Sequence, residues 1–379
     1  MRESRDELGL GGIRDSLADM LFPGTSTLHT RLRYVLFVPW IYLELEQERL
    51  TPQQFAAKAD RTERALISPL VASGDAAGVF GRTAGNQLKR LPSSIYWAAL
   101  GAWGIRLTPY SQGEYHNRIA EARSQRTAVT DRQRLAEAQG DDVDQLPQHS
   151  LHNWHPRLPP APAGFPNQAS LALTNHEAVF IRDLVVRQCS GSLLAHLALL
   201  EDAPDVAAPW EHPAFGEFNS DHKLLLRNAR LFAELMQGAS LSYNYQLALL
   251  AANEALAARH QESLQTWLDE LPEIELAHWS TGSFWNLLIG SSHSISVHTK
   301  RFVESWHHLV MTAPDSLLDN SAALGLVRHR EERLKGARSR FRNRRALEQW
   351  RGFSGVGRFE YRWSNVKALL QDLQDGLRR

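Results

Sequence analysis

The sequence predicts an all-α protein with many helices, arranged as two helical lobes joined by a proline-rich connector. Apolar residues recur at helical spacing along most of the 379 residues. Capping signals, in which a hydroxyl residue is followed three positions later by Gln or Glu, precede two of these apolar runs. Runs that alternate apolar and polar residues, as strands do, are almost absent. Together these three observations favour helices throughout.

Residues 1–106 are predicted to form the N-terminal helical lobe. The apolar run from Tyr34 to Leu43 spans ten residues, which is too short to cross a bilayer, so a buried helix is expected. A second helix is expected to begin after Thr51, whose hydroxyl can cap the helix while Gln54 completes the capping box. The apolar segment around Trp97 and Trp103 is expected to be core or a partner surface.

Residues 107–168 are predicted to be a connector with a charged part and a proline-rich part. From Arg118 to Gln145 the chain is charged and lacks aromatic residues, which predicts a solvated helix or partial disorder. From Pro147 to Pro166, six of twenty residues are proline, and this composition favours an extended segment. The main domain boundary is therefore expected inside this stretch.

Residues 169–327 are predicted to form the second helical lobe. Thr174 and Glu177 make a capping box in front of an apolar helical face. Helical patterns follow from Asp221 to Gly238 and from Gln246 to Arg259, the latter rich in Ala and Leu. A further short amphipathic set consists of Val303, Trp306 and Val310.

Residues 328–379 are predicted to form a basic C-terminal helical element. The segment from Arg330 to Trp350 fits one continuous helix, and Val366 to Leu377 fits a final helix with Ser364 as its cap. The glycine-rich stretch 352–358 between them predicts a turn, with phosphate contact as the alternative.

The composition excludes several classes of protein. The single cysteine, Cys189, rules out an internal disulfide framework and a zinc module built from cysteines. Its place in an apolar pattern predicts a buried, unreactive thiol. The first dozen residues mix both charge signs and lack the apolar core of an export signal. A cytoplasmic protein without a membrane segment is expected.

The net charge of zero conceals an uneven distribution. The chain holds 42 Lys and Arg against 42 Asp and Glu, yet residues 328–379 alone hold 15 basic and 6 acidic residues. The remainder of the chain is therefore acidic. Such an asymmetry indicates a nucleic-acid or other anionic partner.

On a continuous helix, the basic residues between Arg330 and Trp350 would form two stripes. One stripe would hold Glu331, Lys335, Arg338, Arg342 and Arg345, and the other Arg333, Arg340 and Arg344, separated by an apolar seam of Leu334, Ala337 and Phe341. The planar guanidinium group suits phosphate. The candidate nucleic-acid-binding residues, on DNA or RNA, are Lys335, Arg338, Arg340, Arg342, Arg344, Arg345, Arg351 and Arg358.

A second basic group near the N-terminus consists of Arg14, Arg31 and Arg33. Alternatives remain open for both groups. The arginines could form ion pairs with the acidic remainder of the chain, with Glu44 or Glu46 as candidates for the second group. The C-terminal group could equally dock onto an acidic partner protein.

Patterns typical of catalysis are weak. The tripeptide from His298 to Lys300 resembles the core of a phospholipase-D-type phosphodiesterase motif, but Ser305 occupies the position where that motif needs an aspartate. No nucleophile elbow of the G-x-S-x-G type is present. The sequence therefore identifies no catalytic residue, and no cofactor is expected.

Histidine clusters do not predict a metal site. His149, His152 and His155 recur every third residue in the connector, where a solvated loop explains them better than zinc binding does. The pair His307-His308 is expected on a helix, with one ring packed and the other exposed.

Several blocks of the chain resemble an uncharacterised bacterial family of unknown function. The three main blocks run from Glu7 to Tyr34, from Gly78 to Arg106 and from Arg330 to Leu377, and the segments from Ser192 to Leu200 and from Asp221 to Tyr245 fit the family too. Members that resemble this chain accompany helicases and nuclease-like proteins in phage-defence gene clusters, and the Druantia type is one such system. The resemblance implies an accessory component of such a system and carries no active site.

Taken with the charge asymmetry, the resemblance predicts a non-catalytic accessory subunit of a bacterial antiviral defence system. Its expected partners are other subunits of a defence complex, a helicase among them, and the backbone of DNA or RNA. Two alternatives stay open. One is a metal-dependent, nuclease-like enzyme, and the other is an adaptor whose basic tail docks on an acidic partner protein.

Overall fold

A computed structural model describes residues 6–119, 153–314 and 317–379. These residues form an all-α protein, which confirms the predicted fold class. Over the described ranges no strand forms, and the only pairing of the β type is an isolated bridge between Arg106 and Trp154. Most of the charged part of the predicted connector, together with His149 and His152, lies outside the described residues.

The chain divides into two compact units, each built from separate stretches of sequence. The first unit combines the described residues up to Leu21 with Val206–Tyr361. The second combines Phe22–Asp205, less the undescribed residues, with Arg362–Arg379. These boundaries differ from the predicted segments 1–106, 107–168, 169–327 and 328–379. Contacts between residues distant in sequence set the units, and local patterns do not encode such contacts.

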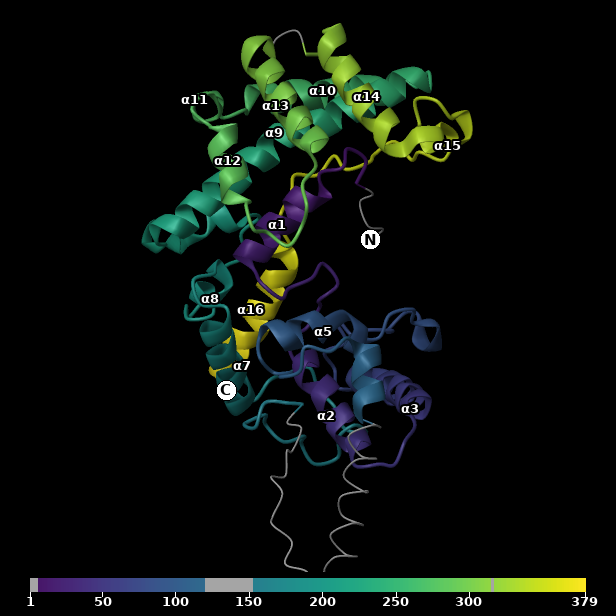
Figure 1. Ribbon diagram of the computed structural model, residues 1–379, viewed down its shortest axis with the longest axis vertical. Coiled ribbons are helices and arrows are strands. Elements are labelled where there is room, and N and C mark those ends of the chain that lie inside the picture. The colour runs from purple at the N-terminus through teal and green to yellow at the C-terminus, as the bar shows by residue number, and fades with distance from the viewer. Residues whose placement is uncertain (1–5, 120–152, 315–316) are drawn as a thin grey trace, which may run out of the picture. The chain divides into compact units, whose positions relative to one another are not determined.

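The first unit is a bundle around two long helices that lie side by side, α9 and α10 (Figure 1). Its α-helices are α1 (Gly11–Leu21), α9 (Ser220–Leu250), α10 (Glu254–Asp269), α11 (Glu273–Ala277), α12 (Thr281–Leu287), α13 (Val297–Thr312), α14 (Ser321–Lys335) and α15 (Arg344–Glu348). Short 3-10 turns occur at η2 (Pro209–Glu211), η3 (Pro213–Glu217) and η5 (Gly336–Arg338). As predicted, Val303, Trp306 and Val310 form the buried face of α13.

Helix α9 does not stop at Gly238, where the sequence predicts an end, but continues for twelve further residues to Leu250. The glycine is needed for packing rather than for a turn. A Cβ atom at Gly238 would lie 2.3 Å from the ring of Trp267 on α10, so only glycine lets the indole approach. The Trp267 Nε1–H donates to the Glu234 carbonyl one turn earlier, at 2.8 Å. Together these contacts hold α10 against α9.

The predicted helical stretch from Gln246 to Arg259 is split between α9 and α10 by a sharp corner. Ala252 adopts φ of +51°, outside the helical region, and Asn253 caps α10 by accepting from the Leu256 N–H at 3.0 Å. Alanine favours helices, and the Ala-Ala-Asn sequence gave no strong stop signal. The corner leaves Leu250 partly exposed.

In the second unit, every residue of α2 (Tyr34–Glu46) from Tyr34 to Tyr42 is buried. The predicted buried helix is therefore confirmed. The remaining α-helices of this unit are α3 (Pro52–Ala65), α4 (Ile67–Ala72), α5 (Pro92–Ala102), α7 (Asn175–Gln188), α8 (Leu193–Leu197) and α16 (Trp363–Leu377), with one 3-10 turn at η1 (Gly85–Gln87). Residues 112–119 are also helical.

Both predicted capping boxes are present in the second unit. The Thr51 hydroxyl accepts from the Gln54 N–H at the start of α3, and the Thr174 hydroxyl accepts from the Glu177 N–H at the start of α7. The last helix, α16, begins one residue before Ser364, with Arg362 in the left-handed region as its cap, so the predicted serine cap is wrong. Helices α16 and α7 lie side by side (Figure 1).

The described end of the predicted connector, 153–168, packs into the second unit instead of running free. Trp154 is buried within a cluster of aromatic rings that includes Tyr42 and Tyr115. The Trp40 Nε1–H donates to the Pro159 carbonyl at 2.7 Å. Trp103 is buried as well, which confirms its predicted place in the core.

Among the helices of the described ranges, none is both long enough and apolar enough to cross a membrane.

Candidate nucleic-acid interface

The basic C-terminal segment does not form the single helix predicted from Arg330 to Trp350. Helix α14 ends at Lys335 because Gly336 adopts φ of +54°, a left-handed conformation that glycine tolerates well. The turn η5, a loop and the short helix α15 follow. The two predicted arginine stripes need an unbroken helix and therefore do not exist. We call residues 336–352 the arginine arm, since they hold six arginines and one acidic residue.

Glu331 of α14 fixes the beginning of the arginine arm. Its side chain is completely buried. The carboxylate accepts a hydrogen bond from the Ser339 hydroxyl and another from the Arg340 backbone N–H at 2.9 Å. A buried carboxylate is costly unless it is hydrogen-bonded, so these two bonds bind the loop tightly to the helix.

Asn244 of α9 fixes the end of the arm. It is completely buried, and its side-chain oxygen accepts from the Ser354 N–H at 2.8 Å and from the Trp350 Nε1–H at 3.2 Å. Its amide donates to the Ser354 carbonyl at 2.8 Å. The His260 Nε2–H donates to the Gly352 carbonyl at 2.8 Å. The glycine-rich stretch is thus the predicted turn, held in place by α9 and α10.

Two of the candidate phosphate ligands, Lys335 and Arg340, are ion-paired with Glu7. The Lys335 Nζ lies 3.0 Å from Oε2 of Glu7, and the Arg340 Nη1 lies 3.0 Å from Oε1. Arg340 also donates to the Tyr243 hydroxyl at 2.8 Å. Because Glu7 is only 7% exposed, these contacts hold the N-terminal segment in place within the first unit. Both cations therefore have a structural role.

Three further candidates are paired but remain open to solvent. The Arg342 Nη2 lies 2.8 Å from Oε2 of Glu332, and this contact lowers the pKa of the Glu332 carboxyl. The Arg344 Nε lies 3.1 Å from Glu348, its neighbour one helical turn away, with 92% of the Arg344 side chain exposed. The Arg358 Nη1 lies 2.7 Å from Glu234. The Arg342 and Arg358 side chains keep 63% and 42% of their surface exposed, although their carboxylate partners are largely buried. Only the Arg344–Glu348 pair is exposed on both sides, and such a pair is weak.

The remaining three candidates, Arg338, Arg345 and Arg351, differ from the five that form ion pairs. All three are exposed, and their side chains have no hydrogen-bond or ion-pair partner among the described residues. Arg338 and Arg345 line a groove of about 560 Å³, which we call the polar groove. The amide side chains of Asn343 and Gln349 line it too. It offers two free guanidinium groups to an anion, while the two carboxylates in its lining, Glu7 and Glu331, are already engaged by internal contacts.

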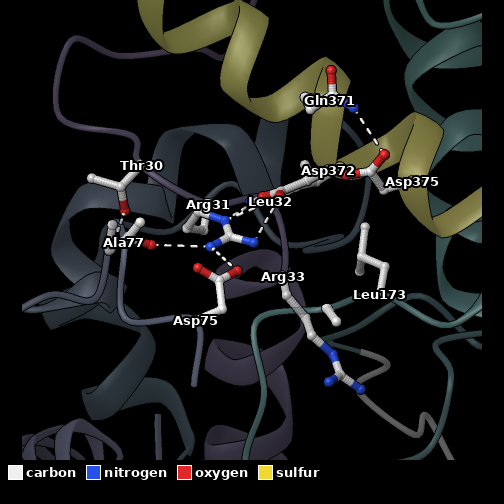
Figure 2. Close-up of polar contacts among 12 residues, drawn as sticks. Thr30, Arg31, Leu32, Arg33, Asp75, Ala77, Leu173, Gln371, Asp372 and Asp375 are labelled. Atoms are coloured by element: carbon white, nitrogen blue, oxygen red, sulfur yellow. Dashed lines mark hydrogen bonds and ion pairs between the residues drawn. The ribbon is translucent and has the colours of Figure 1, made fainter. Parts of the chain in front are cut away.

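The three arginines of the second basic group all form internal ion pairs, and Arg31 forms two of them. Figure 2 shows its guanidinium between Asp75 and Asp372 of the second unit. Its Nη1 lies 2.6 Å from Asp75, and its Nη2 lies 2.9 Å from Asp372, which belongs to α16. Burial raises the pKa of the Asp372 carboxyl, and Arg31 opposes that rise. Asp372 also accepts from the Leu32 N–H at 2.7 Å.

Arg33 and Arg14 are paired as well. The Arg33 Nη2 lies 2.6 Å from Glu177, with both side chains almost completely buried. Arg14 belongs to the first unit and pairs with its neighbour Asp15, at 3.0 Å. The pairing alternative thus describes all three arginines, although neither Glu44 nor Glu46 is a partner.

The remaining sequence motifs do not assemble into a catalytic site. His298 and Lys300 lie on helix α13, and His298 accepts from Arg333 at 2.7 Å. His307 packs against Trp279, while His308 is exposed, as predicted. Burial raises the pKa of Cys189 to about 11, which keeps the thiol protonated at neutral pH. Across the described ranges, no three His, Cys, Asp or Glu side chains come close enough to hold a metal.

Several residues that shape this interface cannot be identified from local sequence. Glu331 and Asn244 look like ordinary surface residues of helical segments, yet both are buried anchors. A polar residue on the otherwise apolar pattern of 221–250 is the one available signal for Asn244. Glu7 gives no signal, because its partners lie more than 300 positions away.

A model of a family of unknown function (DUF6361) matches residues 1–376, nearly the whole chain. No curated protein and no solved structure matches the chain.

Proposed function

Because the chain belongs to this family of unknown function, its role has to be argued from its own residues, and we propose a nucleic-acid-binding accessory subunit of a bacterial antiviral defence system. In this proposal the subunit is not itself catalytic. It helps to assemble a complex with other defence proteins, a helicase among them, and contacts the backbone of DNA or RNA through its arginine arm.

The observation that best supports nucleic-acid binding is the set of unpaired guanidinium groups on the arm. Arg338, Arg345 and Arg351 stay exposed although acidic residues outnumber basic ones in the rest of the chain. Ion pairing within the described part of the chain accounts for Lys335 and Arg340 but not for these three. Guanidinium groups that need no internal partner are available for phosphate oxygens, which they bind in a planar, bidentate manner.

The defence setting is supported by the resemblance of the blocks at Glu7–Tyr34, Gly78–Arg106 and Arg330–Leu377 to proteins encoded in phage-defence clusters. The last of these blocks contains the arginine arm. In the proposal, this most basic segment of the chain contacts the DNA or RNA on which the other proteins of the cluster act. Loss of protection against phage on deletion of the gene, in a strain that carries the cluster, would test this part.

A binding series tests the nucleic-acid part. We expect labelled single-stranded and duplex DNA and RNA to bind with an affinity that falls steeply as salt rises. The double variant Arg338→Glu/Arg345→Glu should lose about tenfold or more in affinity at low salt. Its salt slope should fall by about one for each lost phosphate contact. Fluorescence anisotropy at four or more salt concentrations measures both quantities.

The matched control is Arg61→Glu/Arg301→Glu, which changes the net charge equally. Both residues are exposed on helices that do not belong to the arm, and their side chains have no hydrogen-bond or ion-pair partner among the described residues. This variant should bind almost as the native protein does. Unchanged affinity in a folded Arg338→Glu/Arg345→Glu protein would refute the interface. Cleavage of the probes that depends on a divalent metal would favour the nuclease-like enzyme instead.

A further inference from the structure

The arginine arm also lines a second groove, whose lining residues differ from those of the polar groove. This groove, about 760 Å³ in volume, lies between the arm and the corner that joins α9 to α10. Its floor includes Leu250, Leu256, Leu347 and Trp350, and we call it the leucine groove. All of its lining residues belong to the first unit.

Charge and apolar surface are combined in the leucine groove. Four arginines border it, namely Arg340, Arg342, Arg344 and Arg351. The one acidic residue in its lining, Glu348, is already paired with Arg344. Leu250 is 47% exposed at the end of α9, an apolar side chain left in solvent beside unpaired Arg351. An occupant that matches this groove carries leucine-like side chains and negative charge.

The lining of the leucine groove favours an acidic protein over a nucleic acid as its occupant. Nucleic-acid bases bind on open aromatic faces. Phe341 in this groove is only 9% exposed, and the Arg328 guanidinium lies over its ring at 5.4 Å. Trp350 has His260 stacked near it, with ring centroids 6.3 Å apart. The most exposed large apolar side chain of the groove is therefore that of Leu250, and aliphatic side chains in a groove can take the apolar face of an amphipathic helix.

We propose that the leucine groove binds an acidic amphipathic helix of a partner protein. Leucine-type side chains of that helix cover Leu250, Leu256 and Leu347, and its acidic residues pair with Arg342, Arg344 and Arg351. The inference concerns protein assembly and does not depend on nucleic-acid binding. Only Arg340 lines both grooves, and Glu7 and Tyr243 already engage it.

A designed peptide provides the probe. It is a labelled helix of about 18 residues with Leu at positions i, i+3, i+4 and i+7 and Glu on the other faces. A scrambled peptide of the same composition keeps the charge but loses the apolar face. We expect the amphipathic peptide to bind the full chain about tenfold more tightly than the scrambled one, measured by fluorescence anisotropy.

Leu250→Gln should weaken the amphipathic peptide about tenfold, because it removes an exposed leucine without disturbing the helix. The matched control is Leu224→Gln on the same helix, where the leucine is 53% exposed and lies outside the groove. That control should leave the affinity unchanged. Circular dichroism establishes that both variants are folded.

Three results would overturn the proposal. The first is equal affinity for the amphipathic and scrambled peptides, and the second is equal loss in the Leu250→Gln and Leu224→Gln variants. The third is a single-stranded oligonucleotide whose binding needs Leu250 and competes with the peptide, which would assign the groove to nucleic acid. Arg338→Glu/Arg345→Glu separates this inference from the proposed function, since it should weaken nucleic-acid binding and leave peptide binding intact.

Discussion

Glu63 of α3 shows how strongly burial controls a single charged group in this protein. Its side chain is almost completely buried, at 3% exposed. One carboxylate oxygen accepts from the Ser93 N–H at 2.7 Å, while the other has no hydrogen-bond partner in the described chain. Burial raises the pKa of the Glu63 carboxyl to about 7, since the charged form loses its hydration.

This pKa predicts a pH-dependent stability of the second unit. The pKa of Glu63 in the folded state lies above its value in the unfolded state. Ionisation of Glu63 therefore does not lower the free energy of unfolding below pH 4.5, and it lowers that free energy progressively as pH rises towards 7. Glu63→Gln should therefore gain unfolding free energy over the native protein in that window, by about 3 kcal/mol at most. Urea unfolding at several pH values measures the difference. A difference that stays constant from pH 4.5 to 8 would contradict the assignment.

At the same scale, the fate of each arginine could not be predicted from sequence. Arg31 and Arg345 both stand beside other basic residues, yet Arg31 is held between two aspartates and the Arg345 side chain is free. The difference lies in Asp372, 341 positions from Arg31, which α16 brings to it. Charge counting correctly identified the basic segment, but it could not separate internal pairs from free groups.

At the scale of elements, helix starts were easier to predict than helix ends. Thr51 and Thr174 cap their helices through bonds that span only three residues, so the local sequence contains the whole signal. Glycine as a stop signal is ambiguous. Gly336 ends α14, whereas Gly238 lies inside α9 because Trp267 needs the space. The tertiary contact, which is invisible locally, decides between the two outcomes.

The same substitution at two helical glycines should have opposite effects. Gly238→Ala places a Cβ atom 2.3 Å from the Trp267 ring, so we expect a loss of about 2 kcal/mol or more in unfolding free energy. At Gly325 in α14 the nearest atom to an added Cβ lies 3.8 Å away. Gly325→Ala should therefore stabilise by about 0.5–1 kcal/mol.

Thermal or denaturant unfolding of these two variants provides the measurement, and each serves as the control for the other. If Gly238→Ala were as stable as Gly325→Ala, the close packing of α10 on α9 would be wrong.

At the scale of the whole molecule, α16 completes the second unit although it is far away in sequence. It buries Val366, Leu369, Leu370 and Leu373, lies beside α7 and supplies Asp372 to Arg31. Burying four aliphatic side chains contributes about 6–12 kcal/mol, comparable with the net stability of a typical domain. The helix is therefore essential to the second unit.

Removal of residues 362–379 should unfold the second unit and spare the first. Hydrogen exchange should show lost protection in α2 and α7, with α9 and α10 still protected. Removal of Arg378 and Arg379 alone is the control. It should change little, because both side chains are exposed and lose only surface contacts, such as those with Asp202 and the Leu173 carbonyl. Retained protection of α7 in the longer truncation would contradict this role of α16.

The interleaved composition of the two units has a consequence for biosynthesis. A ribosome delivers the chain from its N-terminus, so residues up to Leu21 must wait for Val206–Tyr361, and Phe22–Asp205 must wait for α16. Neither core can close on a half-made chain, and the nascent protein exposes apolar surface until synthesis passes Leu377. By the same connectivity, no single proteolytic cut releases an intact unit.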